Sequence, residues 1–109
     1  MDIRACLEKA VNTAASDLFL VAGAPLTVKV GGEMRPLDSQ KLLPPDTEGL
    51  LGELYALAGR DIKGFLESGD DDFSFAVGGL ARFRVSAYRQ RSSLAAVIRV
   101  VSFDIPSWE

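Results

Sequence analysis

The strongest constraint on how this chain folds is a two-residue alternation of apolar and polar side chains between Asp72 and Tyr88. Apolar residues occupy every second position of the runs 73–77 and 81–87. A period of two predicts strands that bury one face, since successive side chains of a strand point to opposite sides. The glycine pair between the two runs suits a tight reversal of the chain. We therefore predict two half-buried strands joined as a hairpin.

The register of this hairpin depends on the length of its connection. A two-residue turn made of the glycine pair would place Phe75 opposite Arg82. A three-residue connection that also includes Leu80 would place Phe75 opposite Phe83. Because paired strands must keep their apolar side chains on the same face, we predict the three-residue connection.

The other elements are predicted from hydrophobic spacing and from cap and turn residues. Two helices fall between two groups of strands, which indicates an α+β arrangement. The expected elements are a helix over 2–14 with Asp2 as its N-cap, strands over 17–21, 26–30 and 33–37, a loop over 38–45, a helix that begins at Asp46 or Thr47 and ends at Gly59, a helix over 61–68 that carries Ile62, Phe65 and Leu66 on one side and ends at Gly69, a turn over 89–93, and a strand over 94–101 with both faces covered.

Length and composition exclude several classes of protein. The 109 residues make one domain, and 48% hydrophobic with 25% charged residues is typical of a globular one. The absence of histidine and the single cysteine, Cys6, exclude zinc sites, disulfide frameworks and Ser-His-Asp chemistry. We interpret Cys6 as a small core residue, and one cysteine favours a reducing compartment, the cytoplasm. The charged first 15 residues predict neither a signal peptide nor a membrane span.

The clearest polar feature is a series of five arginines in the last third of the chain. Residues 80–101 contain no lysine and no acidic residue, whereas residues 1–79 carry seven basic and 13 acidic side chains. Guanidinium groups bind phosphate or carboxylate oxygens in a bidentate manner, so the series indicates anion recognition. The alternative is that the arginines pair across the sheet with Glu67 and Asp70–Asp72. The five are Arg82, Arg84, Arg89, Arg91 and Arg99.

Other motif-like features carry less weight. Asp70–Asp72 could hold a magnesium ion, but consecutive carboxylates of an extended segment point in alternate directions, so we expect a solvated turn. Gly49–Gly52 matches the GxxG of an RNA-binding fold, yet it lies in a predicted helix and its interior is apolar. The pI near 4.9 argues against a nucleic-acid partner. The phosphate-binding motif GxxxxGK[ST] is absent from the sequence, so we expect this chain alone not to be an ATPase.

Three segments, taken together, resemble one family. They are ASDLFLVAGAPLTVKVGGEMRPL, which begins at Ala15, DDFSFAVGGLARFRVSAYRQR, which begins at Asp71, and AAVIRVVSFDIPS, which begins at Ala95. In order and spacing they resemble the N-terminal domain of PilT-type ATPases, the motors of type IV pilus retraction within the secretion ATPase superfamily. The resemblance covers residues 2–107. The short helix ahead of the first segment favours a retraction motor over an assembly motor.

The resemblance implies a PAS-like α+β fold, with a mostly antiparallel sheet of about six strands packed with about three helices. Residues 1–103 would form this domain, and residues 104–109 would begin a linker to a RecA-like ATPase core that the sequence does not include. The resemblance implies ATP and Mg²⁺ as cofactors of the full-length parent and none for this chain. The implied partners are the parent's own ATPase core, the neighbouring subunits of a homohexamer and the pilus machinery of the inner membrane. The implied location is the cytoplasm, peripheral at that membrane and without direct insertion.

The resemblance also assigns roles to individual residues. In such motors the N-terminal domain closes over the nucleotide, and two of its arginines approach the bound phosphates. The motif RFRVS places one of them at Arg84, and the motif AVIRVV places the other at Arg99. Arg82 and Arg91 are implied as subunit contacts. The chain departs from the family at Phe19, which stands in place of the histidine of ASDLH, and at Ser92-Ser93, where the family has a glycine-rich turn.

Two hypotheses of different classes follow. The first is the nucleotide-proximal regulatory domain of a hexameric, ATP-driven motor for type IV pilus retraction and twitching motility. The alternative is a free-standing PAS-like sensory or protein-interaction module, which needs an internal apolar pocket if it senses a small ligand. A third hypothesis, a nucleic-acid binder that uses the arginine strand, predicts salt-sensitive retention of oligonucleotides, and we expect none.

Overall fold

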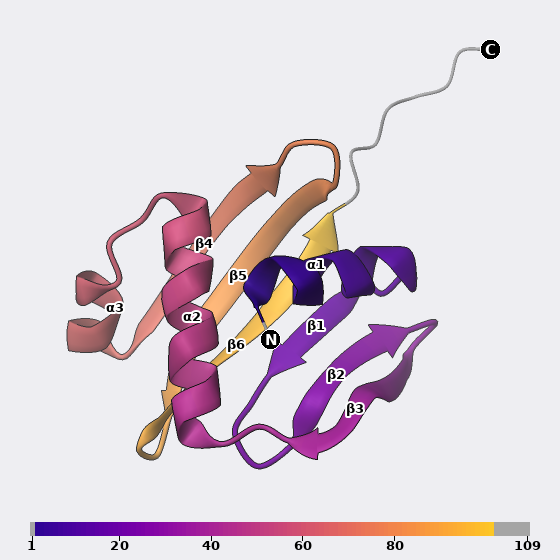
Figure 1. Cartoon of the computed structure of the whole chain (residues 1–109). Coiled ribbons are helices and arrows are strands. Elements are labelled where there is room, and N and C mark those ends of the chain that lie inside the picture. Colours follow the sequence, from indigo (N-terminus) through magenta and orange to yellow (C-terminus); the bar gives the residue numbers. More distant parts are fainter. Residues whose placement is uncertain (1, 102–109) are drawn as a thin grey trace.

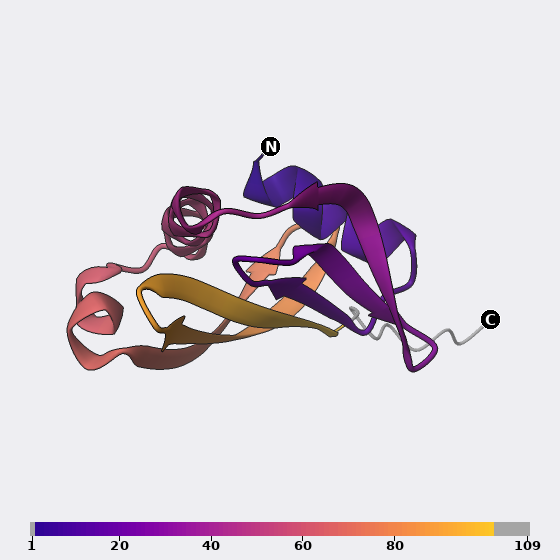
Figure 2. The ribbon, with the colours of Figure 1, turned by 90° about the horizontal axis from the view of Figure 1, so that it is seen from below.

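The structure is a computed structural model that describes residues 2–101. It contains a six-stranded antiparallel sheet and three helices, as predicted (Figures 1 and 2). The expected domain boundary at residue 103 and the expected linker over 104–109 lie outside the described residues. In chain order the elements are α1 (Ile3–Asn12), β1 (Asp17–Leu20), β2 (Pro25–Val30), β3 (Glu33–Lys41), α2 (Pro44–Ala58), α3 (Lys63–Ser68), β4 (Asp70–Val77), β5 (Ala81–Gln90) and β6 (Ser93–Val101).

The strand order places the first and the last strand of the chain's described part at the middle of the sheet. The order is β3-β2-β1-β6-β5-β4, and each neighbouring pair is antiparallel. The connection from the edge strand β3 to the other edge strand β4 contains α2 and α3. Helices α1 and α2 lie on the same side of the sheet (Figure 2). Within residues 2–101, no helix covers the opposite face of the sheet.

Helix α1 begins at the predicted cap. The carboxylate of Asp2 accepts a 2.7 Å hydrogen bond from the N–H of Ala5, and so satisfies a donor that has no partner within the first turn. The helix ends at Asn12, earlier than the predicted residue 14. Ala14 instead has a φ of 60°, a conformation that a helix cannot contain. The buried side chains of the helix are those of Ile3, Cys6, Leu7 and Ala10.

Strand β3 corrects the expectation of a loop over 38–45. The strand continues to Lys41, which pairs with Pro25 of β2. A register shift between Pro25 and Thr27 allows the second half of β3 to stay beside β2. The polar sequence concealed this strand because it lies at an edge of the sheet, where most of its side chains are exposed and hydrophobic alternation is not required.

Helix α2 begins earlier than predicted and ends where predicted. Neither Asp46 nor Thr47 is the N-cap; Leu43 is, with Pro44 as the first helical residue. The carboxylate of Asp46 accepts a 2.8 Å hydrogen bond from the N–H of Leu43. Proline is tolerated at this position because the first N–H groups of a helix have no partner within it. Gly59 ends the helix with a φ of 71°, which favours glycine.

The segment after α2 contains two further corrections. Phe65 of the short helix α3 is buried, but Leu66, predicted on the same face, is 40% exposed. Adjacent helical residues point about 100° apart, and so short a helix buries only a narrow face. Asp70–Asp72 form the start of β4 and pair with residues 86–88 of β5, so the predicted solvated turn is wrong.

The hairpin of β4 and β5 confirms the predicted register. Phe75 lies opposite Phe83, and β4 and β5 are joined by three residues. In this connection the N–H of Leu80 donates a 3.0 Å hydrogen bond to the carbonyl of Val77. The rings of Phe75 and Phe83 lie 5.4 Å apart, a distance at which aromatic side chains attract each other.

The connection between β5 and β6 is tighter than predicted. Strand β5 continues to Gln90 and β6 begins at Ser93, so the turn consists of Arg91 and Ser92 instead of the whole segment 89–93. Strand β6 is not covered on both faces, because Val97, on the face without helices, is only half-buried. The apolar sequence of β6 instead reflects its central place in the sheet.

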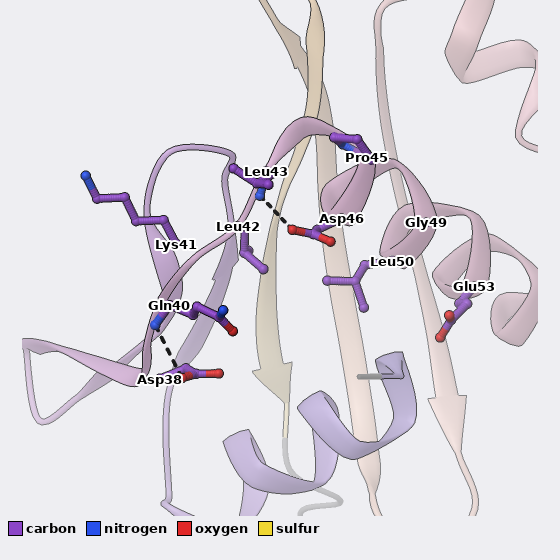
Figure 3. A pocket seen from close by; sticks show the side chains of 10 residues that line it. All are labelled: Asp38, Gln40, Lys41, Leu42, Leu43, Pro45, Asp46, Gly49, Leu50 and Glu53. Carbon is purple, nitrogen blue, oxygen red and sulfur yellow. Dashed lines mark hydrogen bonds between the residues drawn. The ribbon is translucent and has the colours of Figure 1, made fainter.

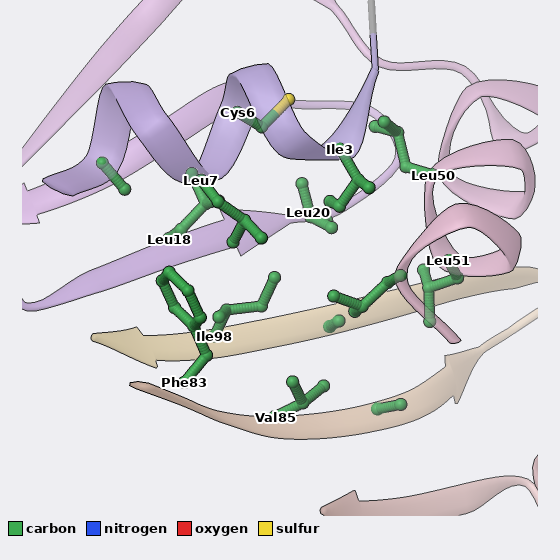
Figure 4. Close-up of a cluster of buried hydrophobic side chains, with 14 of the residues drawn as sticks. Ile3, Cys6, Leu7, Leu18, Leu20, Leu50, Leu51, Phe83, Val85 and Ile98 are labelled. Atoms are coloured by element: carbon green, nitrogen blue, oxygen red, sulfur yellow. The ribbon is translucent and has the colours of Figure 1, made fainter. Parts of the chain in front are cut away.

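The core lies between the helices and the sheet (Figure 4). Leu7 of α1 lies over Leu18, Phe83 and Ile98 of the sheet, and Leu51 of α2 belongs to the same core farther along the sheet. The solvent-exposed fraction of each of the five side chains is 0%. Burial of apolar surface supplies the main driving force of folding. Because this core occupies one face of the sheet, the other face is free to carry polar side chains.

Candidate functional site

The face of the sheet opposite the helices, called the open face below, carries the candidate site residues. Side chains of a strand alternate between the two faces. In β5, Phe83 and Val85 are buried in the core, so Arg82, Arg84 and Ser86 belong to the open face. Pairing with neighbouring strands extends this face across the sheet. Its central members are Asp17, Phe19, Lys29, Asp72, Ser74, Arg82, Arg84, Ser86, Val97 and Arg99.

Four charged residues form one row across the middle of the open face. The partner of Arg84 on β6 is Arg99, the partner of Arg99 on β1 is Asp17, and the partner of Asp17 on β2 is Lys29. The row therefore contains three basic side chains and one acidic side chain. Directly opposed like charges on neighbouring strands destabilise a sheet, so the pairing of Arg84 with Arg99 is unfavourable unless an anion lies near them.

The single acidic residue of the row is mostly buried and engaged on both of its oxygens. Asp17 is 8% exposed. One carboxylate oxygen, Oδ2, accepts a 2.8 Å hydrogen bond from the hydroxyl of Ser16. The other, Oδ1, lies 3.6 Å from Nε of Arg99 and forms an ion pair with it. Sequence reasoning missed Asp17 as a site residue, because its link to Arg99 depends on the pairing of β1 with β6.

The two predicted phosphate-proximal arginines are brought together. Arg84 and Arg99 both line an open surface hollow of about 570 Å³, whose wall also contains Asp17, Asp72 and Ser86. Within residues 2–101, no ion pair or hydrogen bond engages the guanidinium of Arg84. Arg99 uses only Nε for its ion pair, so its terminal nitrogens remain able to bind an anion. Two guanidinium groups can therefore donate hydrogen bonds to the oxygens of one phosphate or carboxylate at once.

The two predicted subunit contacts lie at different places. Arg82 belongs to the open face two residues before Arg84, and it pairs with Val101 and Ala76 instead of with a charged residue. Arg91 lies in the turn between β5 and β6, with a φ of 58°. The structure therefore groups Arg82 with the site and separates Arg91 from it.

The five arginines of the series do not form ion pairs with Glu67 or Asp70–Asp72 within residues 2–101, contrary to the alternative interpretation. Asp71 pairs with Arg60, at 3.3 Å from Nη2, and not with an arginine of β5 or β6. The guanidinium of Arg89 donates a 2.8 Å hydrogen bond to the carbonyl of Leu66, so it links β5 to α3. Among the ion pairs within residues 2–101, Arg99 with Asp17 is the one that involves the arginine series.

A second hollow lies beside the start of α2 (Figure 3). Each of its three acidic side chains accepts a backbone hydrogen bond: Asp38 from Gln40, Asp46 from Leu43 and Glu53 from Ile3. These carboxylates thus hold the chain in place. Gly49, of the GxxG match, lines this hollow and lies within α2, where it cannot form the loop that the RNA-binding motif needs.

Two groups with shifted pKa values lie in the core and not at the arginine row. Burial raises the pKa of the Cys6 thiol to about 11, so the thiol stays protonated near neutral pH and is a poor nucleophile. Burial and a 2.8 Å hydrogen bond to Asp71 raise the pKa of the Tyr55 hydroxyl above its usual value of 10.0. Neither residue is therefore a candidate for chemistry at the open face.

Residues 2–101 contain no group of three acidic, histidine or cysteine side chains placed to hold a metal ion. Across the same residues, no helix is long and apolar enough to span a membrane.

Comparison with known proteins links the chain to pilus motors. No family model matches it. The type IV pilus ATPase PilU and the type IV pilus retraction ATPase PilT, both of Pseudomonas aeruginosa, are each 36% identical to it over 110 residues. These alignments cover all of this chain but 28% of PilU and 31% of PilT. The chain thus matches the N-terminal part of these ATPases and spans about a third of their length.

Solved structures give the same relationship. A crystal structure of the pilus retraction motor PilT with bound ADP has a TM-score of 0.81 and 36% identity, over 98% of this chain and 31% of that one. The ATPase DotB of Legionella pneumophila has a TM-score of 0.65 at 22% identity, over 92% of this chain and 28% of that one. The second likeness concerns the fold alone.

Proposed function

We propose that this chain, which matches the N-terminal part of the pilus ATPases PilU and PilT, is the N-terminal domain of an ATP-driven motor of type IV pilus retraction and twitching motility. In the parent protein it is followed by an ATPase core, and the subunits form a homohexamer in the cytoplasm, at the inner-membrane machinery of the pilus. ATP and Mg²⁺ bind to the core, and this domain contributes arginines to the phosphates. By itself the domain does not hydrolyse ATP.

One observation carries the assignment of the site: Arg84 and Arg99 lie directly opposite each other on β5 and β6. Asp17 balances one of these two positive charges, and bidentate binding of phosphate oxygens is the interaction that suits the charge left over. The neighbouring hollow of about 570 Å³ is open to the surface, so a phosphate group held by another domain can reach both residues.

The position of the arginines on a separate domain gives them a regulatory role. When the domain closes over the nucleotide, Arg84 and Arg99 neutralise phosphate charge, and when it opens they withdraw. Binding of ATP therefore favours the closed arrangement by the free energy of these contacts. The same contacts stabilise negative charge on the phosphates during hydrolysis, as arginines do in other phosphoryl-transfer enzymes.

Arg82 and Arg91 serve contacts between subunits in this proposal. Arg82 lies near the start of β5 and Arg91 follows its end, so the two residues can touch different parts of a neighbouring subunit. Arg82 shares the open face with the phosphate-binding pair, whereas Arg91 extends the contact to the turn before β6.

The hollows of the structure do not favour the alternative of a ligand-sensing module. A sensor of this fold class needs an apolar cavity inside the core. The two largest hollows described are surface grooves with mixed polar and apolar walls.

The test uses the longer protein in which this chain is joined to its ATPase core. Arg84→Ala and Arg99→Ala are expected to lower ATP turnover about ten-fold or more, because each removes a cation from the phosphates. The matched control is Arg35→Ala, an exposed arginine of β3 whose one ion-pair partner among residues 2–101 is Glu33, close by in sequence. Undiminished turnover in both Arg84→Ala and Arg99→Ala would refute the phosphate role.

A second measurement separates the phosphate role from subunit assembly. Mass photometry of the same proteins should show intact hexamers for Arg84→Ala and Arg99→Ala. Arg82→Ala and Arg91→Ala should instead shift the population toward smaller species. Loss of hexamers in the first pair would indicate that the two arginines act in assembly instead of at the nucleotide.

A further inference from the structure

We propose that the carboxylate of Asp17 is an internal counter-anion for the Arg84–Arg99 pair, which stabilises the sheet when no phosphate is bound and lowers the affinity of the pair for phosphate. The inference rests on the proposed function of the two arginines. Asp17 does not touch the nucleotide in the proposed function, and the resemblance assigns it no role. It predicts that the loss of one carboxylate strengthens the binding of an anion while it weakens the fold.

The geometry places Asp17 where such an ion must be. It is the partner of Arg99 on β1, on the side away from Arg84, so the order across three strands is acidic, basic, basic. Its Oδ1 lies 3.6 Å from Nε of Arg99. All three residues line the same surface hollow. The carboxylate therefore acts on the same space that a bound phosphate would occupy.

Burial makes this charge more effective than that of an exposed acid. The side chain of Asp17 is 12% exposed, whereas that of Arg99 is 67% exposed. Solvent screens a buried charge less than an exposed one, so Asp17 acts strongly on its neighbours. The hydroxyl of Ser16 donates a hydrogen bond to Oδ2 and fixes the direction of the carboxylate. The anion is thus built into the sheet and cannot move away when phosphate arrives.

The charge balance gives the expected sign of each effect. Without Asp17, the row would contain only the basic residues Lys29, Arg99 and Arg84, and their mutual repulsion would destabilise the sheet. A phosphate near Arg99 is attracted by the arginines and repelled by Asp17. At separations of several ångströms near a protein surface, one unit charge changes binding about three- to ten-fold. Asp17 thus lowers the affinity of the arginines for phosphate and raises the stability of the sheet.

The experiment measures binding of pyrophosphate to the 109-residue chain by NMR, using the Nε–H signals of Arg84 and Arg99, together with thermal unfolding. Asp17→Asn keeps the shape and can still accept the hydrogen bond of Ser16, but it removes the charge. It is expected to bind pyrophosphate about three- to ten-fold more tightly and to unfold about 4–8 °C lower. If Asp17 had only a structural role, its replacement by asparagine would lower both the affinity for pyrophosphate and the unfolding temperature.

Two controls define the effect. Asp72→Asn removes the same charge from the wall of the same hollow, but Asp72 is exposed and within residues 2–101 forms no ion pair, so its effect on affinity should be smaller. Asp17→Glu retains the charge and should keep the affinity of the unchanged chain within about two-fold. If Asp17→Asn is unfolded without an anion, addition of pyrophosphate is expected to fold it.

The outcomes separate this inference from the proposed function. Unchanged or weaker pyrophosphate binding by Asp17→Asn, or its failure to fold with pyrophosphate, overturns the inference. If Arg84→Ala and Arg99→Ala abolish binding in that case, the phosphate role of the arginines stands. If neither alanine variant changes binding, or if neither the unchanged chain nor Asp17→Asn binds pyrophosphate, both proposals fail.

Discussion

Arg84 of β5 and Arg99 of β6 lie directly opposite each other on the open face of the sheet. The pairing joins two positive charges at the centre of a small domain, and it carries a cost in stability that the ion pair of Arg99 with Asp17 and the core together offset. Residues kept at such a cost are often functional, and the cost can itself be measured.

Replacement of Arg84 by threonine is expected to raise the free energy of unfolding by about 0.2–1 kcal/mol, because it removes one of two opposed like charges. The matched control is Arg82→Thr on the same strand and face, since Arg82 lies opposite Val101. Both changes introduce the same strand-forming residue, so the difference between them isolates the charge pair. Urea unfolding measures it. Equal effects of the two substitutions would show that Arg84 and Arg99 do not repel each other.

Removal of the Tyr55 hydroxyl is expected to lower the free energy of unfolding by about 1–2 kcal/mol, because Tyr55→Phe leaves one oxygen of Asp71 without its 2.8 Å hydrogen bond. Arg60 still contacts that carboxylate, which limits the loss. Tyr88→Phe is the control, since no hydrogen bond within residues 2–101 involves the Tyr88 hydroxyl. Denaturant unfolding of both variants gives the comparison, and similar losses in the two would contradict a specific role for the Tyr55–Asp71 bond.

Two glycines, one within helix α2 and one directly after it, are expected to respond in opposite directions to alanine. Gly52 lies within the helix with open space around it, so Gly52→Ala should stabilise the chain by about 0.5–1 kcal/mol. Gly59 ends the helix with a φ of 71°, so Gly59→Ala should destabilise it by about 1 kcal/mol. Thermal or urea unfolding distinguishes the signs. A stabilising Gly59→Ala would mean that the left-handed end of α2 is wrong.

The stability of the chain is expected to fall in alkaline solution because of Cys6. Burial raises the pKa of the folded thiol from 9.0 to about 11. Below pH 9 the thiol is protonated in both states, so its contribution is fully present; between about pH 9 and 11 only the unfolded chain loses the proton, and the free energy of unfolding decreases.

The measurement is a series of urea unfolding curves across this pH range, with Cys6→Ala as the reference. The variant is less stable at neutral pH because a buried side chain is shortened, but its decline above pH 9 should be shallower. Parallel declines of the two proteins would rule out Cys6 as the source. The protonated, buried thiol should also react slowly with iodoacetamide at pH 8.

Sequence reasoning succeeded where a repeated pattern had one physical meaning. The alternation around Phe75 and Phe83 required a shared apolar face, and that requirement fixed the register of β4 and β5. Gly59 likewise marked the end of α2, because a left-handed residue closes many helices. In each case the local chemistry allowed one solution.

Sequence reasoning failed where neighbours in space decided the outcome. The second half of β3 lies at an edge of the sheet and is polar, so the sequence contains no hydrophobic pattern that predicts a strand there. The N-cap of α2 is Leu43, whose side chain cannot accept a hydrogen bond. The carboxylate of Asp46 instead fixes the start of the helix by accepting a hydrogen bond from the N–H of Leu43. At the site, the resemblance pointed to Arg84 and Arg99. Asp17 could not be predicted, because its contact with Arg99 arises from the pairing of β1 with β6, which are far apart in the sequence.

The central pairing of β1 with β6 has a consequence for how this domain is made. Its strands come from opposite ends of the described chain, so the long intervening loop must close before their hydrogen bonds can form. During synthesis, β1–β3 can be complete while Arg99 has not yet emerged from the ribosome. The arginine row thus cannot assemble in a partly made chain, and the nascent β1 exposes an unpaired edge until β6 arrives.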